Sequence, residues 1–589
     1  MTGLLQDIRY ALRQLRKNPG FTAVAVITLA LGIGANTGIF TLVNAVLLKS
    51  LPVPNPEQLY LVNQGDFEPH NTRFAYPMFQ NARAAMPRGS ELTAASFPGQ
   101  FYASFGADEP EMVTGQLVSG NYFATLKTSP AKGRLLGEND DRLDTSPLAV
   151  ISYGCWERHF GLDPKIIGRK ITVNGVPAQI VGVTARGFFG AQVGTVPEFW
   201  LPTATQSAVR YQQHYSQNTN AKTDAPWVLQ PDIRWLQFII RVKSPELVGQ
   251  TSAALNQVFH LALGVEREPD PSERQAILRR HLNLMPGARG LPTLRTDFSR
   301  PLLALMAMVG IILLIACANL ANLLLARAAA REHEIAVRLS IGAGRTRLMR
   351  QMFVECFLLS AGGTLLGSAI AYWLSEVLPK WVSGGDKSIV LNLAPDERVL
   401  FFTTAIGVLT GIAFGLAPAL YGIRVQPIGA LKSSGRLGGR TEERWSLKQA
   451  LVSFQVALSL VLVIGAGLFV RTLENFNTID AGFDRDHLVT VGLDTHLAVY
   501  SHEQLKSLYR TLVDRVEAIA GVRSASLLSC EIAAGCSDAS DIYLPNVPHT
   551  NGETDAQERR VSQEFFASTG IPLLKGRLFS DSGTETSPN

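Results

Sequence analysis

The sequence contains few residues arranged to do chemistry. The P-loop pattern G-x-x-x-x-G-K-[ST], whose backbone cradles nucleotide phosphates, is absent, and so is a G-x-S-x-G nucleophile elbow. The pairs His333-Glu334 and His502-Glu503 lack the second His that a zinc-binding H-E-x-x-H helix requires. The ten His residues are scattered along the chain. We therefore expect no catalytic residue, no metal ion and no bound cofactor.

Five cysteines offer little redox chemistry in so long a chain. Cys317 and Cys356 lie in apolar runs, whereas Cys155, Cys530 and Cys536 lie outside them. Cys530 and Cys536 could close a short disulfide in an oxidising compartment, or they could be two free thiols. Their spacing alone does not establish the Cα separation that a disulfide needs.

The segment from Glu334 to Arg345 combines a helical pattern, basic charge and a sharp break. The pattern predicts an amphipathic helix that carries Ile335, Leu339 and Ser340 and that ends at the Gly342-Ala343-Gly344 turn. A basic helix beside a membrane can simply bind anionic lipid at the surface. The alternative is a short helix that docks into a groove on a partner protein.

The composition indicates membrane helices. Only 17% of the 589 residues are charged, and the mean hydropathy is +0.12. Five uncharged runs are each long enough to cross a hydrocarbon layer of about 30 Å. The runs are Asn18–Leu48, Pro301–Ala326, Cys356–Ser375, Val399–Ile423 and Gln449–Val470. A buried helix of a soluble core is usually shorter and has a polar face, so we predict five spans.

The first run could instead be a cleaved signal peptide, since Arg9, Arg13, Arg16 and Lys17 precede it. Its apolar stretch is about twice as long as a usual signal core, and no clean cleavage site follows before Pro52, so we predict an anchored span. Residues 1–17 form an amphipathic pattern typical of a helix on the inner membrane surface.

Polar residues within the spans are costly in lipid. Asn36, Asn319 and Asn322 should therefore face other helices or a small polar pocket, and Asn319 and Asn322 share a helical face. Hydrogen bonding between helices is one interpretation, and a site for a translocated ligand is the other. Gly363-x-x-x-Gly367 predicts a close approach between two spans.

The basic residues predict the orientation. Segments 1–20, 327–350 and 422–448 hold four, six and six Lys and Arg against one, two and two acids. The rest of the chain is net negative, although the whole carries +5. If five spans alternate, these three segments lie on one side, which the positive-inside rule identifies as the cytoplasm.

Two folded segments would then lie outside, at 49–300 and 472–589. In the first, Asn174-Gly175 between two apolar runs predicts a hairpin of strands 170–173 and 176–183. A strand at 235–242 should lead into a helix at about 246–261. In the second, a strand at 488–493, a helix at 503–520 and a strand at 522–528 predict a βαβ or ferredoxin-like unit.

The two outer segments also share a sequence pattern. Residues 118–136, VSGNYFATLKTSPAKGRLL, align without a gap on 561–579, VSQEFFASTGIPLLKGRLF, and eight of nineteen positions are identical. We interpret this as an internal duplication, the alternative being two unrelated pieces with similar turns. The second copy would be incomplete, and the intact molecule would be a parallel repeat of four plus four spans.

Several longer motifs carry a family resemblance. ACANLANLLLARAAAREHEIAVRLSIGAGRTRLMRQMFVE at 316–355 and GLAPALYGIRVQPIGALK at 415–432 resemble the FtsX-like permease domain of ABC systems of the MacB type. VSGNYFATL, AVISYGCWERHFG and IGRKITVNGVPAQIVGV resemble the MacB-like periplasmic core domain. The lead-in from LLQDIRYALRQLRKNPGF onward is similar to duplicated orphan permeases first noted in acidobacteria.

This resemblance implies a permease without its own ATPase, whose inner loop couples to a separate nucleotide-binding subunit. Six residues fall on the coupling-helix motif: Glu334, Arg338, Gly342, Ala343, Gly344 and Arg345. In such systems ATP-driven closure moves the membrane helices and with them the outer domains, a mechanotransmission that drives export. MacB itself differs, because it carries a fused ATPase and four spans.

The implied fold class is a multi-span α-helical membrane protein with large α+β extracytoplasmic domains of ferredoxin-like or porter type. The expected function is ATP-coupled efflux or export, and the alternative is an FtsX-like signalling scaffold that activates a periplasmic partner without transport. The expected partners are a cytoplasmic ABC ATPase subunit, membrane lipids and a periplasmic adaptor or hydrolase. Only the ATPase subunit would bind ATP, and we expect no nucleic acid partner. The expected location is the bacterial inner membrane, with the N-terminus in the cytoplasm.

The predicted boundaries follow the chain. They are a lead-in 1–20, spans 21–48, 301–326, 351–378, 399–423 and 449–471, a MacB-like core 49–300, a coupling loop 327–350, a second loop 424–448 and a second outer domain 472–589.

Overall fold

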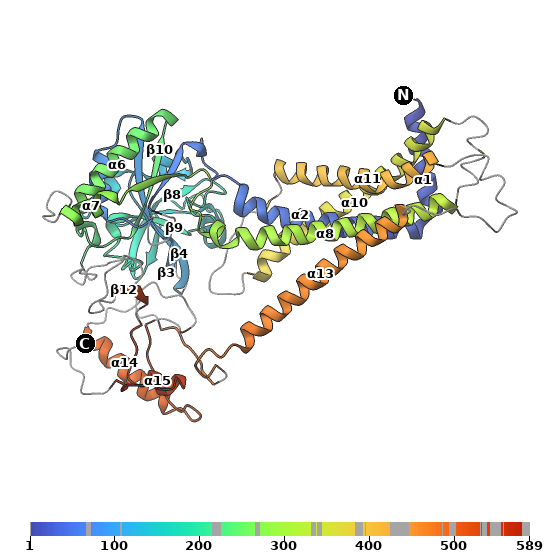
Figure 1. Cartoon of the computed structure of the whole chain (residues 1–589). Helices are drawn as coiled ribbons and strands as arrows, with labels where there is room; N and C mark the ends of the chain where they lie inside the picture. Colours follow the sequence, from blue (N-terminus) through green and yellow to red (C-terminus); the bar gives the residue numbers. More distant parts are fainter. Residues whose placement is uncertain are drawn as a thin grey trace.

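The molecule has a helical part and a part built on a large sheet, as the computed structural model shows (Figure 1). Helix α1 lies at the end of the helical part farthest from the sheet, and α13 diverges from the other long helices. The structure describes all residues except 1, 66–71, 107–108, 215–224, 265–270, 331–336, 338–343, 383–392, 395, 425–446, 486, 494–501, 530–531, 533–538, 542–554, 558 and 580–589.

Every predicted apolar run is helical, and five helices in the described chain are long and apolar enough to cross a membrane. A short helix, α1 (Thr2–Lys17), precedes them. The five are α2 (Pro19–Val43, continued by a π-helical turn at Asn44–Leu48), α8 (Thr293–Ala330), α10 (Arg345–Val382), α11 (Glu397–Arg424) and α13 (Leu447–Thr478). We call the end of this bundle that carries α1 the basic end.

Glycines allow α2 and α10 to pack closely against each other. A Cβ atom placed on Gly34 would lie 3.0 Å from the carbonyl oxygen of Gly367, and one on Gly363 would lie 2.5 Å from Cβ of Leu29. Only hydrogen fits at such positions, so the two backbones approach more closely than larger residues would allow. The small-residue spacing on α10 is therefore a packing device, as the sequence predicts.

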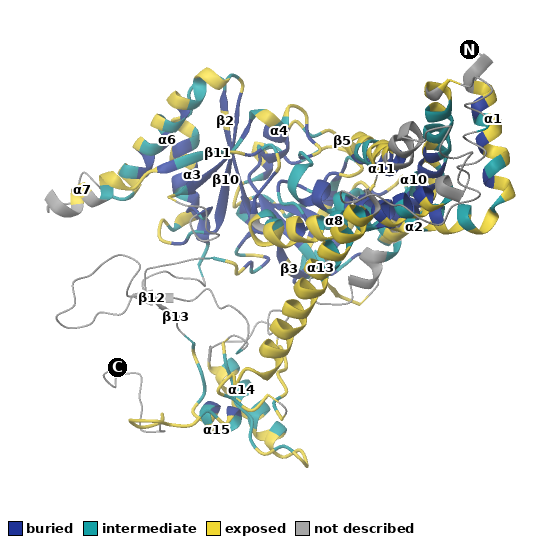
Figure 2. Ribbon diagram, turned by 45° about the vertical axis from the view of Figure 1, so that its right-hand side comes forward, coloured by how far each residue is buried: buried dark blue, intermediate teal, exposed yellow. Residues whose placement is uncertain are grey.

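Helix α13 is the exception in the bundle. None of the residues in its most apolar 18-residue stretch is buried, whereas 44% of the residues in the most apolar stretch of α2 are buried. The first half of α13 packs near α8, with Leu451 among several partly buried residues, and every residue from 463 to 478 is exposed (Figure 2). Exposed apolar residues suit a helix that lipid surrounds.

The sheet domain contains eleven strands in one mixed sheet, of which ten follow the order β11-β1-β10-β2-β4-β3-β7-β8-β6-β9. Most neighbours are antiparallel, but β4 pairs with β9 and β6 with β8 in parallel. The strands are β1 Leu59–Gln64, β2 Ser90–Ser96, β3 Gly99–Ser104, β4 Glu111–Val118, β5 Pro130–Gly133, β6 Leu148–Ile151, β7 Lys170–Val173, β8 Val176–Thr184, β9 Phe199–Pro202, β10 Leu236–Val242 and β11 Leu282–Pro286.

Helices cover the sheet and bury its faces. They are α3 (Tyr76–Ala84), α4 (Tyr122–Leu126), α5 (Tyr153–Phe160), α6 (Val248–Ala262) and α7 (Pro271–Arg279). The seven residues of β10 are all buried (Figure 2). Strands β1 and β2 flank β10, and its apolar residues belong to two separate apolar clusters. The strand at 235–242 and the helix near 246–261 thus form as predicted.

The Asn174-Gly175 hairpin also forms as predicted. Strands β7 and β8 pair with Val173 opposite Val176. Asn174 has φ 47° and Gly175 has φ 82°, the two positive values that a tight hairpin turn requires. The Asn174 side chain also donates to the Val209 carbonyl at 2.7 Å, which ties the turn to the domain.

The second outer segment differs from the predicted βαβ unit. Helix α14 (His502–Glu517) forms, but residues 488–493 form no strand, and 522–528 contribute only an isolated bridge at Leu528. Val489 and Val491 are 85% and 84% exposed, so no neighbouring strand in the described part of the chain covers them. A strand needs hydrogen-bonding neighbours, which local sequence pattern does not supply. Two short strands, β12 (Ala539–Asp541) and β13 (Asp555–Gln557), pair with each other.

The two aligned segments nevertheless share local structure. The helix α4 at Tyr122–Leu126 and the helix α15 at Phe565–Thr569 occupy aligned positions. Each ends on a residue with left-handed backbone, Lys127 with φ 56° and Gly570 with φ 71°. The resemblance between the copies therefore extends from sequence to backbone geometry.

Candidate functional site: the two ends of the helix bundle

At the basic end, ion pairs join three helices. Asp7 on α1 accepts from Arg350 on α10 at 2.7 Å, and its side chain is only 1% exposed. Arg327 on α8 pairs with Glu355 on α10 at 3.1 Å, and both side chains are largely buried. The Arg327 guanidinium also lies 4.7 Å from the ring centre of Phe21 on α2. Both side chains of the Arg327–Glu355 pair and the Asp7 carboxylate are shielded from water, whereas Arg350 is about half exposed.

These pairs flank the predicted coupling helix. Glu334, Arg338, Gly342 and Ala343 lie outside the described residues. Gly344 is exposed, and its carbonyl accepts the amide of Arg347 at 3.0 Å as α10 begins. Arg345 is the first residue of α10. In the sequence, the motif lies between the end of α8 and the start of α10, the two helices that Arg327 and Glu355 join.

The three intramembrane asparagines do not form one site. Asn36 is buried and donates to the carbonyls of Gly32 on its own helix and Val309 on α8, both at 2.9 Å. Asn319 is exposed, contrary to the expectation that it faces a neighbouring helix, because this side of α8 has no neighbour in the described chain. Asn322 is half-buried. The geometry gives Asn36 an interhelical bond and assembles no polar pocket from the three.

At the other end, polar bonds join α2 to α11. Asn44 in the π-helical turn donates to the Asp396 carboxylate at 2.7 Å, and Asp396 caps α11 by accepting the Val399 amide at 3.0 Å. Arg398 donates to the Leu48 carbonyl at 2.7 Å. Burial raises the pKa of Asp396, but the hydrogen bonds from Asn44 and from the Val399 amide lower it more. The pKa of Asp396 therefore lies below its usual range.

The sheet domain begins directly beyond this junction. The Leu51 amide donates to the Ala288 carbonyl at 2.9 Å, and Arg289 donates to the Leu47 carbonyl at 3.2 Å. Val43 and Leu302 belong to one buried apolar cluster that joins α2 to α8. The segments that enter and leave the sheet domain are thus bonded to each other and to the end of α2, and α2 packs on α8 there.

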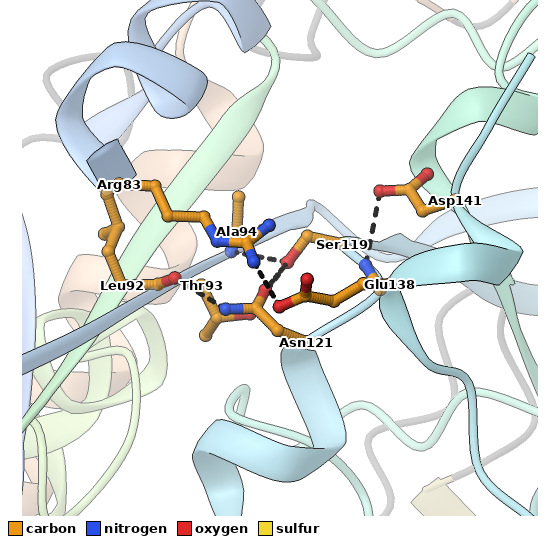
Figure 3. A network of polar contacts seen from close by, with 9 residues as sticks. Arg83, Leu92, Thr93, Ala94, Ser119, Asn121, Glu138 and Asp141 are labelled. Atoms are coloured by element: carbon orange, nitrogen blue, oxygen red, sulfur yellow. Dashed lines mark hydrogen bonds and ion pairs between the residues drawn. The ribbon is translucent and has the colours of Figure 1, made fainter.

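Inside the sheet domain, the repeated Val-Ser motif is the centre of a polar network (Figure 3). The Ser119 hydroxyl accepts the Ala94 amide at 3.0 Å and contacts the Thr93 hydroxyl at 2.8 Å. Asn121 donates to the Leu92 carbonyl at 2.8 Å. The Gly120 amide donates to Asp141, and Arg83 pairs with Glu138 beside it. The loop after β4 is thereby fixed to β2 and to the loop around residue 140.

The second copy repeats the core of this network. The Leu527 amide donates to the Ser562 hydroxyl at 3.0 Å, and the Ser562 amide donates to the Leu527 carbonyl at 2.9 Å. The same two bonds join Ala94 and Ser119, at 3.0 and 2.9 Å. The β-bridge Leu528–Val561 likewise corresponds to the pairing of Ala95 with Val118.

The structure also brings together residues that the sequence analysis missed. One ligand atom each of Cys155, His159 and Glu198 lies within 4.8 Å of the others, although we expected no metal-ligating group. The C-x-x-x-H spacing of the first two on a helix was the available signal; Glu198 comes from a distant segment. Burial and the neighbouring Glu198 carboxylate raise the pKa of the Cys155 thiol. Cys530 and Cys536 lie outside the described residues, so their pairing stays a prediction.

Family comparisons agree with this architecture. Residues 22–258 match the MacB-like periplasmic core domain, and residues 306–427 match the FtsX-like permease C-terminal domain. The chain contains two domains of the MacB/FtsX-like ABC permease type. The predicted fold class, a multi-span α-helical membrane protein with large α+β extracytoplasmic domains, is confirmed in its apolar helices and its mixed-sheet MacB-like domain. The ferredoxin-like or porter-type form of those domains stays a prediction.

Curated relatives of this permease are export proteins. The macrolide export ATP-binding/permease protein MacB of Chromobacterium violaceum is 25% identical over 327 residues, which are 53% of this chain and 42% of that protein. The pyoverdine export ATP-binding/permease protein PvdT of Pseudomonas aeruginosa is 24% identical over 420 residues, 70% of this chain and 54% of that protein. The chain thus spans about half the length of the curated relatives it matches.

Two solved structures are similar to parts of this permease. One is the extracellular domain of the noncanonical ABC-type transporter YknZ from Gram-positive bacteria, with 12% identity, a TM-score of 0.26, and coverage of 38% of this chain and 99% of that one. The other is the periplasmic region of MacB from Actinobacillus actinomycetemcomitans, with 10% identity, a TM-score of 0.28, and coverage of 42% and 94%.

Proposed function

We propose that this permease is the membrane subunit of an ABC-type export system and works with a separate cytoplasmic ATPase subunit. The curated relatives are named as export proteins that combine ATP binding with a permease. The family domains matched here are permease domains alone, and the sequence contains no P-loop. ATP would therefore be bound only by the partner.

The observation that carries this proposal is the continuous link between the two ends of the bundle. Helix α10 begins at the coupling motif and packs along α2, which leads into the sheet domain. Ion pairs fix the helices at the basic end, and Asn44 with Asp396 fixes them at the other. Packed helices with close backbone contacts move as units, so a displacement at the motif would reach the sheet domain.

The orientation follows from the charge pattern. The basic end would lie in the cytoplasm of a bacterium, and the sheet domain and the segment after α13 would lie on the periplasmic side of the inner membrane. Basic residues at this end would also contact anionic lipid headgroups. A periplasmic adaptor or hydrolase would bind the outer domains.

Co-purification tests the ATPase partnership. The double substitution Arg338→Glu and Arg345→Glu should abolish retention of an ABC ATPase on the full-length chain expressed in its native host. A matched control, Arg440→Glu with Arg444→Glu, makes the same charge change in the other basic loop and should retain the ATPase. If the unmodified chain retains no ATPase, or if the first double variant retains it fully, the proposed coupling is wrong.

An FtsX-like signalling role is the second candidate, since the same motion could activate a periplasmic hydrolase without transport. Reconstituted permease and ATPase in vesicles distinguish the two. Export predicts ATP-dependent movement of a labelled substrate across or away from the membrane. Signalling predicts ATP-dependent activation of a periplasmic partner with no substrate movement.

A further inference from the structure

Three side chains of the sheet domain form a cluster that the transport mechanism does not use. Cys155 and His159 lie four residues apart on α5 and therefore project from one face of that helix. Glu198 comes just before β9, and its backbone fixes it in place. Its amide donates to the Thr114 carbonyl at 2.7 Å, and its carbonyl accepts the Ser152 amide at 2.8 Å.

The helix that carries the first two ligands is itself well anchored. Ser152 caps it by accepting the Cys155 amide at 2.9 Å. The ring of Phe105 stacks on the His159 ring with centroids 4.1 Å apart, which fixes the plane of the imidazole. Cys155 is fully buried, whereas the His159 side chain is 20% exposed, so the cluster is reached from solvent on the His159 side.

One carboxylate oxygen of the cluster has unmet bonding capacity. Glu198 Oε1 pairs with Arg158, but Oε2 is buried and has no hydrogen-bond partner among the described residues. A buried carboxylate oxygen without a donor is costly, and a bound cation would satisfy it. A second carboxylate, Glu111, lies beside the His159 ring, with Oε1 3.3 Å from Nδ1.

We propose that Cys155, His159 and Glu198 bind one divalent transition-metal ion of the zinc class in the sheet domain. A thiolate, an imidazole and a carboxylate together favour zinc or cobalt over magnesium and calcium, which prefer oxygen ligands alone. Their ligand atoms lie within 4.8 Å of one another, and bonds of about 2.0–2.3 Å would draw them together around one ion.

Charge balance also favours a dication. A thiolate, the Glu198 and Glu111 carboxylates and the Arg158 guanidinium sum to two negative charges, which one divalent ion neutralises. The Cys155 thiol gives its proton to solvent when the ion binds. Glu111 orients the imidazole through Nδ1, in the manner of carboxylates that support metal-bound histidines.

Cobalt(II) provides a direct test, because a thiolate ligand gives it a near-ultraviolet charge-transfer absorption. Titration of the full-length chain in detergent with CoCl₂ should produce this band and tetrahedral visible bands, with saturation at one equivalent. Addition of ZnCl₂ should abolish both sets of bands. The control Cys530→Ser with Cys536→Ser should leave them unchanged, since those cysteines are not ligands in this site.

Two single variants test whether Cys155 and His159 bind the ion. Cys155→Ser should abolish the charge-transfer band, and His159→Gln, at a partly exposed position that should fold normally, should weaken cobalt binding at least tenfold. Glu157→Gln, exposed on the same helix, should bind cobalt like the unmodified protein. The proposal is overturned if the unmodified chain shows no thiolate band at one equivalent, or if His159→Gln binds cobalt unchanged.

Discussion

The close contact between α2 and α10 makes a quantitative prediction for Gly367→Ala. The added methyl carbon would lie 2.9 Å from the Ala30 carbonyl oxygen and 3.0 Å from the Gly34 amide nitrogen. Non-bonded heavy atoms ordinarily pack at about 3.5–4.0 Å. Because both neighbours are backbone atoms, neither can rotate away, and the helices must separate by several tenths of an ångström.

The free-energy cost of the clash at Gly367 can be separated from the intrinsic preference of helices for alanine over glycine. Overpacking of a tight interior typically costs about 1–3 kcal/mol, whereas alanine favours a helix over glycine by about 1 kcal/mol. Gly38→Ala on α2 is the matched control, because nothing lies within 4 Å of the added methyl carbon. The propensity gain is common to both variants, so Gly367→Ala should be less stable than Gly38→Ala by about 1–3 kcal/mol.

Unfolding of the detergent-solubilised chain by increasing mole fraction of SDS, followed by circular dichroism, measures this difference. The unmodified protein should be about 1 kcal/mol less stable than Gly38→Ala, and at least as stable as Gly367→Ala. Equal midpoints for Gly367→Ala and Gly38→Ala would show that the two helices do not meet at this glycine, and the rigid link between the bundle ends would be refuted.

Three further predictions concern the sheet domain and its junction. The bond from Arg134 lowers the pKa of Asp140, so its stabilising effect is present above the unfolded pKa of about 3.9 and is lost as pH falls through the folded value. Thermal unfolding of Asp140→Asn should therefore differ from that of the unmodified protein at pH 6, and the difference should narrow as pH falls below about 3.9; a difference that is constant with pH would contradict this. Asn44→Ala removes the donor to Asp396 and should destabilise the α2–α11 junction by about 1–3 kcal/mol in the same SDS titration. An unchanged unfolding midpoint would show that this hydrogen bond does not stabilise the junction. Ser562→Ala should speed hydrogen exchange of the Leu527 amide, and unchanged exchange would contradict the repeated network.

Local patterns predicted much of the architecture. The five apolar runs became helices because charge-free stretches of this length leave few alternatives. The Asn174-Gly175 turn formed because its positive φ values are properties of two adjacent residues. The pairing of Ser119 with Ala94, repeated by Ser562 and Leu527, follows the sequence duplication.

Features that depend on distant contacts were harder to predict. The apolar alternation at 488–493 resembles a strand, but a strand forms only where a neighbour supplies hydrogen bonds. Asn319 is exposed because its environment depends on which helices surround α8, not on its own cost in lipid. Cys155 and His159 share a helix face, but Glu198 joins them only through the tertiary fold.

We propose that ATP hydrolysis by a partner ATPase moves the periplasmic domains through the helix bundle. The most direct test places fluorophores at Glu157 on α5 and Arg510 on α14, both exposed, and measures energy transfer in the reconstituted complex of permease and ATPase. We expect ATP to change the distance between the two labels, and Arg338→Glu with Arg345→Glu to abolish the change. If the distance stays constant while the bound ATPase hydrolyses ATP, hydrolysis does not move these domains.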